Sequence, residues 1–590
     1  MTLFKFRSNE RRPDYAGDVC IRPTRRCSRE NSCKRILLAD IRVARRLAPV
    51  LRELRKGVPL VLSSNIYFQF YCLSVLEKAI KNNYPLDPSL QQFLWTSLLS
   101  ASTRFLGQKL QSVIILLFQS EYPHTWPNFF HELLVLSRQP GAIDAFLGVC
   151  NTLHESVVDI YINRTDAEIS RNTLIKDNMR IQDVPLLISR WTEILSSGTD
   201  LNSSNSVIKL FSNFVSWVDI NLLVNSPFLA LLDSCLRNPA LSVSAIECID
   251  HIISKGMLPD DKLRLLSLVN VPNLISQLSP SVEMDERIAH LLNSTGLELV
   301  QMYSTSSDRT SVLATIFAIH PLVVRYVANE YDDTTACLFP YISSLTAMLR
   351  KNKTINMDVS GLLVALIEKL AYDADAEFGD DDDGLFQQMR RAIIGILESI
   401  SNLNTELYVS CMTSFIYNRL NRVQQEPTWQ NVDAILFVAL NFAPRTKDKQ
   451  PCTYRPAVIA AIFNANVPLL ITRHVSMLYL ETLAKYATYI AQEHLQTALL
   501  SYLDNRGLRS EMPNVRMRAS YLFARFVKNV PISTQFIDEI IANLLPLLVV
   551  PARYVTKGVV GSSRVDLQLF ECTGYLCGKS ARADEMISVI

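Results

Sequence analysis

Apolar residues recur with the period of an α-helix near residue 520. Counted from Ala519, they fall at i, i+3, i+4, i+7, i+8 and i+11, which places them on one stripe of a helix. The stripe consists of Ala519, Leu522, Phe523, Phe526, Val527 and Val530. The opposite face carries Arg518, Tyr521, Arg525 and Lys528. The pattern therefore predicts an amphipathic helix that begins at about Val515.

A loop is expected just before this helix. Gly507 and Pro513 break the preceding helix, and Asn514 is placed to cap the next one. Two helices therefore meet at a basic corner. A helix pair of this kind cannot bury its apolar stripe alone and must stack against copies of itself. The pattern favours a HEAT-type repeat.

The helical period continues along most of the chain, and no long stretch alternates with the period of a strand. Further helices are expected at 206–218, 241–256, 283–303, 310–328 and 335–351. At roughly 40–47 residues per HEAT unit, the chain holds about twelve units after a basic leader. The predicted fold is all-α, a superhelical solenoid of HEAT repeats (an ARM-type fold).

Composition supports this class. The chain has 590 residues, of which only 17 are Gly, and no change of composition divides it into ordinary domains. The longest apolar run, 540–550, is interrupted by Asn543 and Pro546 and is shorter than the roughly 18 residues of a membrane span. No membrane insertion is expected. The twelve Cys are scattered without a CxxC pair, which indicates a reducing compartment.

Positive charge is concentrated at the start of the chain. Residues 1–56 hold 16 Lys and Arg against 6 Asp and Glu, a net charge of +10; the whole chain carries +2, so residues 57–590 carry −8. Residues 1–33 are predicted to be disordered. Residues 34–56 are predicted to form a basic amphipathic helix, which is a nuclear localisation patch, a phosphate-binding helix, a divergent first repeat or the product of a mistaken gene start. Any RNA site in the acidic remainder must be a local basic stripe.

No pattern typical of catalysis or metal binding is found. Cys20, Cys27 and Cys33 have the wrong spacing for zinc and lack a nearby His. The acidic run at 373–383 fails as a calcium loop, because Phe378 and Gly384 stand where the EF-hand needs Gly and Glu. No phosphate-binding Gly loop, nucleophile elbow or HExxH occurs. We expect no enzyme, no metal and no cofactor, and interpret 373–383 as an acidic loop between helices.

A second basic pattern lies at 165–195. Thr165 and Glu168 form a predicted capping box. Asn172, Lys176 and Arg180 follow at i, i+4 and i+8, a stripe of donors that suits a nucleic-acid backbone or is an ordinary solvated face. Leu174 and Ile181 are expected to point away from this stripe.

Several longer segments carry a family resemblance. They are SNIYFQFYCLSVLEKAIKNNYP at 64–85, EYP and WPNFF within 121–130, TDAEISRNTLIKDNMRIQDVPLLISRWTEIL at 165–195, HVSMLYLETLAKYATYI at 474–490, DNRGLR at 504–509, VRMRASYLFARFVK at 515–528 and VDLQLFECTGYLCG at 565–578. The chain resembles the exportin-T family, the tRNA nuclear export receptors of the importin-β (karyopherin) superfamily. The segments at 121–130 are common to the superfamily, and Trp126, Phe129 and Phe130 are expected to be core residues.

The resemblance implies a domain organisation. Residues 1–56 form an atypical leader, 57–150 the karyopherin amino-terminal repeats (exportin-1/importin-β-like), and 151–590 HEAT repeats with the acidic loop. Members of the family extend beyond Ile590, so a chain truncated at its carboxyl end is expected. Arg516 stands where HEAT units carry an arginine that ties neighbouring repeats, and a structural role is expected for it.

The resemblance also implies a function. The receptor would bind tRNA cooperatively with Ran-GTP, contact FG-repeat proteins of the nuclear pore, shuttle between nucleus and cytoplasm as a monomer, and release its cargo on GTP hydrolysis. The candidate tRNA contacts are Arg171, Lys176, Arg180, Arg506, Arg509, Arg518, Arg525 and Lys528. The candidate Ran contacts are Lys109, Asp380, Asp381, Asp382 and Asp383. The alternative is a HEAT-repeat karyopherin or scaffold for protein cargo.

Overall fold

The computed structural model describes residues 65–82, 89–198, 200–224, 227–377, 383–442, 454–530, 534–548 and 563–579. These residues form helices and connecting turns without any β-strand, which confirms the all-α class. Contacts divide the chain into two compact units, Met1–Trp191 and Thr192–Ile590. The basic leader lies outside the described residues. The expected domain boundary at 150 stays a prediction.

The first unit contains helices α3 (Ile66–Lys81), α4 (Leu90–Leu99), α5 (Arg104–Glu121), α6 (Phe129–Ser137) and α7 (Ile143–Leu153), followed by the start of α8 (Asp166–Ser197). A short π-helical segment, His154–Val158, follows α7. Helix α5 packs against α3, α4 and α7, and α6 packs against α7. Trp126, Phe129 and Phe130 are buried in this unit, which confirms them as core residues.

The second unit is a succession of helix pairs. The first helices of the pairs are α11 (Phe228–Leu236), α13 (Pro259–Val269) with α14 (Val271–Ser276), α16 (Arg309–Val327), α19 (Ser360–Glu368), α21 (Thr405–Gln425), α23 (Tyr454–Asn464), α25 (Gln492–Leu503) and α27 (Thr534–Leu544). The second helices are α12 (Ser242–Ser254), α15 (Val282–Thr305), α17 (Asp332–Cys337) with α18 (Phe339–Lys351), α20 (Asp383–Ser401), α22 (Trp429–Asn441), α24 (Ser476–Tyr486), α26 (Pro513–Asn529) and α28 (Ser563–Cys577). Helices α9 (Leu201–Val215) and α10 (Asn221–Val224) precede them.

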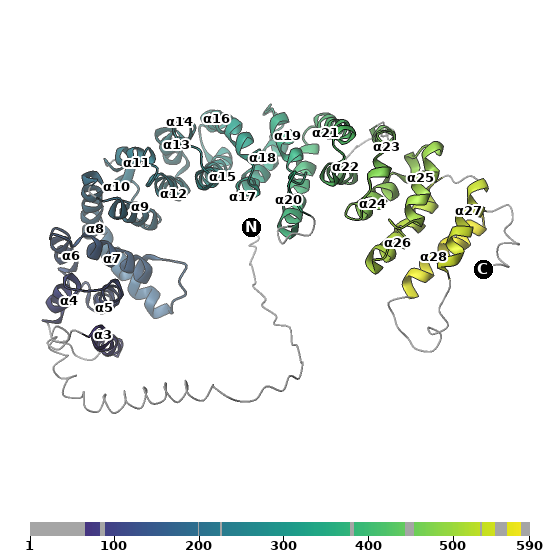
Figure 1. Ribbon diagram of the computed structural model, residues 1–590. Coiled ribbons are helices and arrows are strands. Elements are labelled where there is room, and N and C mark those ends of the chain that lie inside the picture. Colours follow the sequence, from purple (N-terminus) through teal and green to yellow (C-terminus); the bar gives the residue numbers. More distant parts are fainter. Residues whose placement is uncertain are drawn as a thin grey trace, which may run out of the picture. The chain divides into compact units, whose positions relative to one another are not determined.

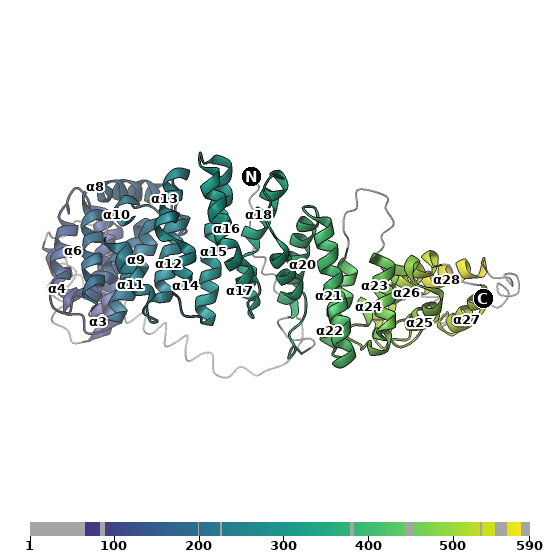
Figure 2. The same cartoon turned by 90° about the horizontal axis from the view of Figure 1, so that it is seen from above.

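Many helices contact their counterparts in the neighbouring pairs. The second helices make one row, in which α15 contacts α12 and α18, and α26 contacts α24 and α28. The first helices make another, in which α19 contacts α16 and α21. Figures 1 and 2 show the pairs following one another in chain order from α11 to α28. Two rows of stacked helices are the arrangement of a HEAT solenoid.

Lysines tie successive pairs together at their helix ends. Lys255, which follows α12, donates from Nζ to the carbonyl oxygens of Val215 (2.8 Å) and Ser216 (3.1 Å) at the end of α9. Lys485 of α24 donates to carbonyls at the end of α22, including that of Phe442 (3.0 Å). A cation suits the unsatisfied carbonyls and negative dipole end of a helix, so these contacts lock one repeat onto the next.

Among the helices that the structure describes, one, α16, is long and apolar enough by length and composition to cross a membrane. It packs against α14, α15, α17 and α19. Its buried residues include Val312, Ile316 and Val323. The helix is therefore a member of the first row, whose apolar stripe faces its neighbours.

The structure confirms the predicted stripe of α26, because Ala519, Leu522, Phe523, Phe526, Val527 and Val530 are all buried. The capping prediction was wrong. Helix α26 begins at Pro513, Asn514 is its second residue, and the residue that precedes the helix, Met512, makes no side-chain cap. Proline suits the first helical position, since its missing N–H would have no partner there. In the loop before the helix, a Cβ at Gly507 would collide with the carbonyl of Tyr502, so the chain needs glycine there.

Candidate functional site

The basic corner comprises the five predicted tRNA contacts on α26 and the loop before it: Arg506, Arg509, Arg518, Arg525 and Lys528. Arg506 is used by the fold. Its Nε lies 2.8 Å from Oδ2 of Asp504, and its Nη1 donates to the carbonyl of Pro468 at 2.7 Å. This arginine therefore holds the loop against the preceding pair, and little of its hydrogen-bonding capacity remains for RNA.

Two other cations of the corner bridge neighbouring repeats from an exposed position. Arg518 donates twice to Oε1 of Glu481 on α24, at 3.0 and 2.7 Å. Lys528 donates to Oε1 of Glu571 on α28 at 2.8 Å. Exposed pairs of this kind are worth little in stability, so both cations are free to exchange their partner for a phosphate.

Arg509 and Arg525 are exposed, and neither side chain makes an ion pair or hydrogen bond with any residue that the structure describes. They are the most accessible cations of the basic corner. Arg516, for which a structural role was expected, donates from Nη1 to the carbonyls of Ser510 (2.7 Å) and Glu511 (3.0 Å). It therefore holds the loop before its own helix, and the expected tie to a neighbouring repeat is not among its contacts.

The second predicted set, Arg171, Lys176 and Arg180, lies on α8 in the first unit. The capping box is confirmed: Thr165 N–H donates to Glu168 Oε2 at 2.8 Å, and Glu168 N–H donates to Thr165 Oγ1 at 3.4 Å. These hydrogen bonds hold the pKa of Glu168 below its ordinary value. The helix therefore begins where the sequence predicted.

The predicted donor stripe of α8 needs a correction. Asn172 is only 3% exposed, and its side-chain amide donates to the carbonyl of Ser156 at 3.0 Å. It faces the core, because Ile175 and Met179, at i+3 and i+7, are buried beside it. Lys176 is half-buried and Arg180 is exposed, 3.1 Å from Asp177 Oδ1. Arg171 is half-buried as well.

The two apolar residues of α8 that were expected to point away from the donor stripe are exposed, because the buried side of the helix is the side of Asn172, Ile175 and Met179. Leu174 is exposed, and Ile181 is 78% exposed. The face of α8 that meets solvent is therefore partly apolar, and its cations stand at the border of the buried stripe. The basic corner and the cations of α8 belong to different compact units.

The candidate Ran contact Lys109 has a partner within the first unit. Its Nζ forms an ion pair with Glu77 of α3 and lies 5.1 Å from the centre of the Phe70 ring. Lys109 and then Lys81 hold the pKa of Glu77 below its ordinary value. The lysine side chain is 16% exposed, so a contact to Ran would require this pair to open. The Ran role of Lys109 stays a prediction.

The acidic loop is only partly described. Asp380, Asp381 and Asp382 lie outside the described residues, as does the side chain of Asp383, the first residue of α20. The described first part of the run contributes Asp373, Asp375 and Glu377 to the lining of a cavity of about 810 Å³ in the second unit. Glu330, Asp332 and Asp333, one repeat earlier, line the same cavity. Leu385, Phe386 and Met389 of α20 supply apolar wall.

We call this cavity, with its carboxylates from 330–333 and 373–377, the acidic groove. Its negatively charged side chains repel one another. Burial raises the pKa of Asp373, and the carboxylates of Asp332, Asp375 and Glu330 raise it further, against a lowering by Lys369. Lys369 is itself bound to Asp332 at 3.0 Å. The groove therefore carries more negative charge than its described cations neutralise, which favours a cationic partner.

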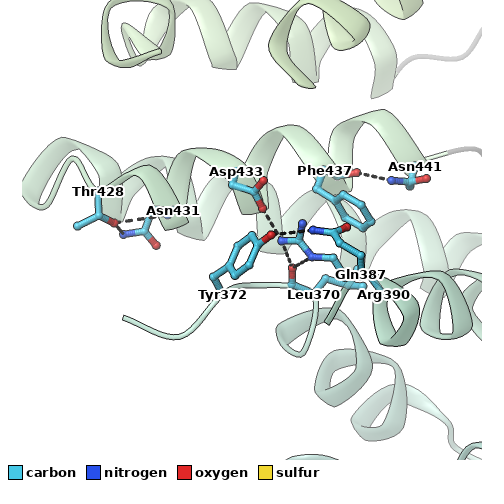
Figure 3. A network of polar contacts seen from close by, with 9 residues as sticks. All are labelled: Leu370, Tyr372, Gln387, Arg390, Thr428, Asn431, Asp433, Phe437 and Asn441. Carbon is cyan, nitrogen blue, oxygen red and sulfur yellow. Dashed lines mark hydrogen bonds and ion pairs between the residues drawn. The ribbon is translucent and has the colours of Figure 1, made fainter. Parts of the chain in front are cut away.

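Arg390 holds the segment that leads into the acidic loop, at Leu370 and Tyr372, as Figure 3 shows. Its guanidinium is buried, donates to the carbonyl of Leu370, and forms an ion pair with Asp433 of α22. The rings of Tyr372, Phe386 and Phe437 lie 4.2–4.5 Å from the guanidinium carbon. Gln430 of α22 also donates to the carbonyls of Ala374 and Ala376 at 3.2 Å. The segment 370–376 is therefore fixed against two repeats.

The sequence prediction missed the part of the acidic groove that lies at the start of α17. The acidic residues Glu330, Asp332 and Asp333 stand about one HEAT period before Asp373 and Asp375, and that spacing is visible in the sequence. Aligning the charges of successive repeats would have found them. Among the described residues, no three His, Cys, Asp or Glu side chains are placed to hold a metal ion.

Comparison with known sequences shows what the chain is similar to. The sequence model described as Exportin-T matches residues 306–583, and the one described as Exportin 1-like protein matches residues 103–249. Exportin-T of Danio rerio is 28% identical over 568 residues, covering 89% of this chain. The chain is similar to exportin-T proteins over most of its length.

Other exportin-T proteins match at a similar level. That of Homo sapiens is 26% identical over 87% of this chain, and that of Yarrowia lipolytica is 26% identical over 79%. The chain spans 58% of the length of the Danio rerio and Homo sapiens proteins. The basic corner lies within the segment that the Exportin-T family sequence model matches.

Solved structures confirm the fold. The structure titled "Importin13 cytosolic state" superposes with a TM-score of 0.61 at 13% identity, covering 85% of this chain and 61% of that one. The crystal structure of Kap121p superposes with a TM-score of 0.51 at 14% identity, covering 91% and 49%. Structural similarity at such a low sequence identity establishes a shared fold and says nothing about the cargo.

Proposed function

We propose that this chain is a nuclear transport receptor of the exportin-T family that binds tRNA together with Ran in its GTP form. In this proposal the complex crosses the nuclear pore through contacts with FG-repeat proteins, and GTP hydrolysis on Ran then releases the tRNA. The protein would act as a monomer that shuttles between nucleus and cytoplasm. Similarity to exportin-T proteins of animals and yeast over most of the chain is the observation that carries the proposal.

The accessible cations of the basic corner support RNA binding. Residues 57–590 carry a net charge of −8, so the chain cannot attract RNA by its overall charge. Arg509 and Arg525 are exposed, and Arg518 and Lys528 need only exchange a surface carboxylate for a phosphate. Together with Arg171, Lys176 and Arg180 of α8, they are the proposed phosphate contacts. Such contacts read the folded shape of an RNA through its backbone.

The acidic groove supports a second, basic partner, and we assign this role to Ran. The groove combines carboxylates with the apolar side chains of Leu385, Phe386 and Met389. Arg390 holds the adjoining backbone in place through its hydrogen bond to the carbonyl of Leu370. Asp380, Asp381 and Asp382 lie outside the described residues and follow Glu377 after two residues in the sequence. Together with Asp383 and Lys109 they remain proposed Ran contacts.

The test measures tRNA binding by the chain with and without Ran loaded with a non-hydrolysable GTP analogue, at two salt concentrations. The expected result is that Ran strengthens tRNA binding and that salt weakens it, since each phosphate contact adds to the salt slope. Ran loaded with GDP is the matched control and should leave the tRNA affinity unchanged.

Two results would contradict the proposal. If Ran binds and tRNA does not, the chain is a receptor or scaffold for protein cargo. If tRNA binds with the same affinity in the presence and absence of Ran, the RNA site is not coupled to the transport cycle. Repeating the measurement with a full-length relative separates a wrong assignment from a site that lies in the additional length of the relatives.

A further inference from the structure

The centre of the exposed face of α26 is occupied by an aromatic ring. Tyr521 lies opposite the buried stripe, and its side chain is 44% exposed. Met517, one turn before it, is 47% exposed. Together, the exposed Tyr521 and Met517 form a small apolar platform on α26. The packing of the helix pair does not require this platform, because Tyr502 of α25 packs on the other side of α26, against Phe523 and Phe526.

Three cations lie near this platform on the same face of α26. Arg518, three residues before Tyr521, holds its guanidinium carbon 5.4 Å from the centre of the tyrosine ring. Arg525 follows one turn later and Lys528 two turns later on the same face. Arg518 forms an ion pair with Glu481 of α24, and Lys528 forms one with Glu571 of α28. Arg525, next to the ring, forms no ion pair with any residue that the structure describes.

We propose that Tyr521 is a stacking site for an unpaired nucleotide of the bound RNA. A base presents a flat face, which stacks on an aromatic ring or on an arginine guanidinium plane, and Tyr521 and Arg518 offer both at one place. Arg525 and Lys528 contact the phosphates on either side of that nucleotide. The inference rests on the proposed function and goes beyond it, because backbone contacts fix the position of the RNA without contacting its bases.

The charge on this face selects RNA over an apolar protein segment as the occupant. The three cations next to Tyr521 outnumber the two carboxylates that orient them, so the platform has a net positive charge. An apolar peptide would bury Arg525 without neutralising it, at a cost in desolvation. A nucleotide places its base on the ring and its phosphate on the arginine.

The experiment compares two RNA probes on the full chain. One is a hairpin with a single 2-aminopurine in its unpaired loop, and the other is a fully paired duplex of the same length. Wild type is expected to quench the 2-aminopurine, since stacking lowers its fluorescence. Tyr521→Leu is expected to abolish the quenching and to weaken hairpin binding by roughly tenfold. Tyr521→Phe retains the ring and should keep both properties.

The controls separate stacking from other roles. Duplex binding by Tyr521→Leu should change by less than about twofold, because its phosphate contacts remain. Tyr417→Leu, which removes a similarly exposed tyrosine from α21, should match wild type on both probes. Equal weakening on hairpin and duplex, or quenching that persists in Tyr521→Leu, would overturn the inference. If wild type binds neither probe, the proposed RNA-binding function itself fails.

Discussion

At the scale of single residues, similar arginines serve different purposes. Arg506 and Arg525 stand on the same corner, and the sequence pattern did not distinguish them. The structure does: Arg506 bonds to Asp504 and to the carbonyl of Pro468, whereas Arg525 is exposed and keeps its guanidinium available. The difference arises from contacts between residues far apart in the sequence, which helical periodicity cannot reveal.

This difference predicts opposite effects of two equivalent substitutions. Arg525→Gln should leave thermal stability unchanged and reduce the salt slope of tRNA binding by about one, the contribution of one phosphate contact. Arg506→Gln should destabilise the chain by about 1–2 kcal/mol, because the loop before α26 loses charged hydrogen bonds. Thermal melts and tRNA titrations at several salt concentrations measure both effects. A stability loss in Arg525→Gln with an unchanged salt slope would reverse the assignment.

Arg390 supports a second prediction at this scale. Arg390→Met should leave the carboxylate of Asp433 without its cation in a nearly buried position, at a cost of about 3–5 kcal/mol. The double variant Arg390→Met/Asp433→Leu removes both charges and should recover part of that loss. Denaturant unfolding of the two variants makes the comparison. A double variant that is less stable than Arg390→Met would contradict the prediction, since it would show that Asp433 stabilises the fold through contacts other than Arg390.

At the scale of elements, the ends of the helices hold the repeats together. The sequence predicted the helices well, because each buried stripe is a local pattern: the stripe of α26 is buried in full, and α12, α15 and α16 stand within a few residues of their expected positions. Prediction failed where a partner from another element decides. Asn172 belongs to the same predicted stripe as Lys176, but its hydrogen bonds with Ser156 and Gln119 hold it against the core.

The lysine ties between repeats predict a pH effect. Burial, aided by Arg455, lowers the pKa of Lys485 to about 8, compared with about 10.5 for an unfolded chain. Between these values the unfolded chain binds a proton that the folded chain has released, so this lysine makes stability rise with pH. Lys485→Met should lose that contribution. Its melting temperature relative to wild type should therefore fall as the pH rises from 8 to about 10.

Lys209→Met, at an exposed position on α9, is the matched control for the loss of one positive charge. Its difference from wild type should stay constant over the same pH range. A Lys485→Met variant whose difference from wild type is also constant would show that Lys485 keeps its proton while it caps α22.

At the scale of the whole molecule, length and periodicity predicted a solenoid, and the fold comparisons confirm it. The function is less accessible from the sequence, because a solenoid spreads its contacts over many repeats and has no single motif that marks the site. The acidic groove illustrates this limit. It joins two charge runs about one period apart, and neither run alone indicates a cavity.

The central claim is that tRNA and Ran-GTP bind this chain cooperatively, and thermodynamic linkage tests it most directly. The measurement is the affinity of Ran, carrying a non-hydrolysable GTP analogue, with and without saturating tRNA, compared with the tRNA affinity with and without saturating Ran. The account predicts the same factor in both directions, roughly 5–150-fold. A factor of one in both directions would contradict it, since the two partners would then bind independently.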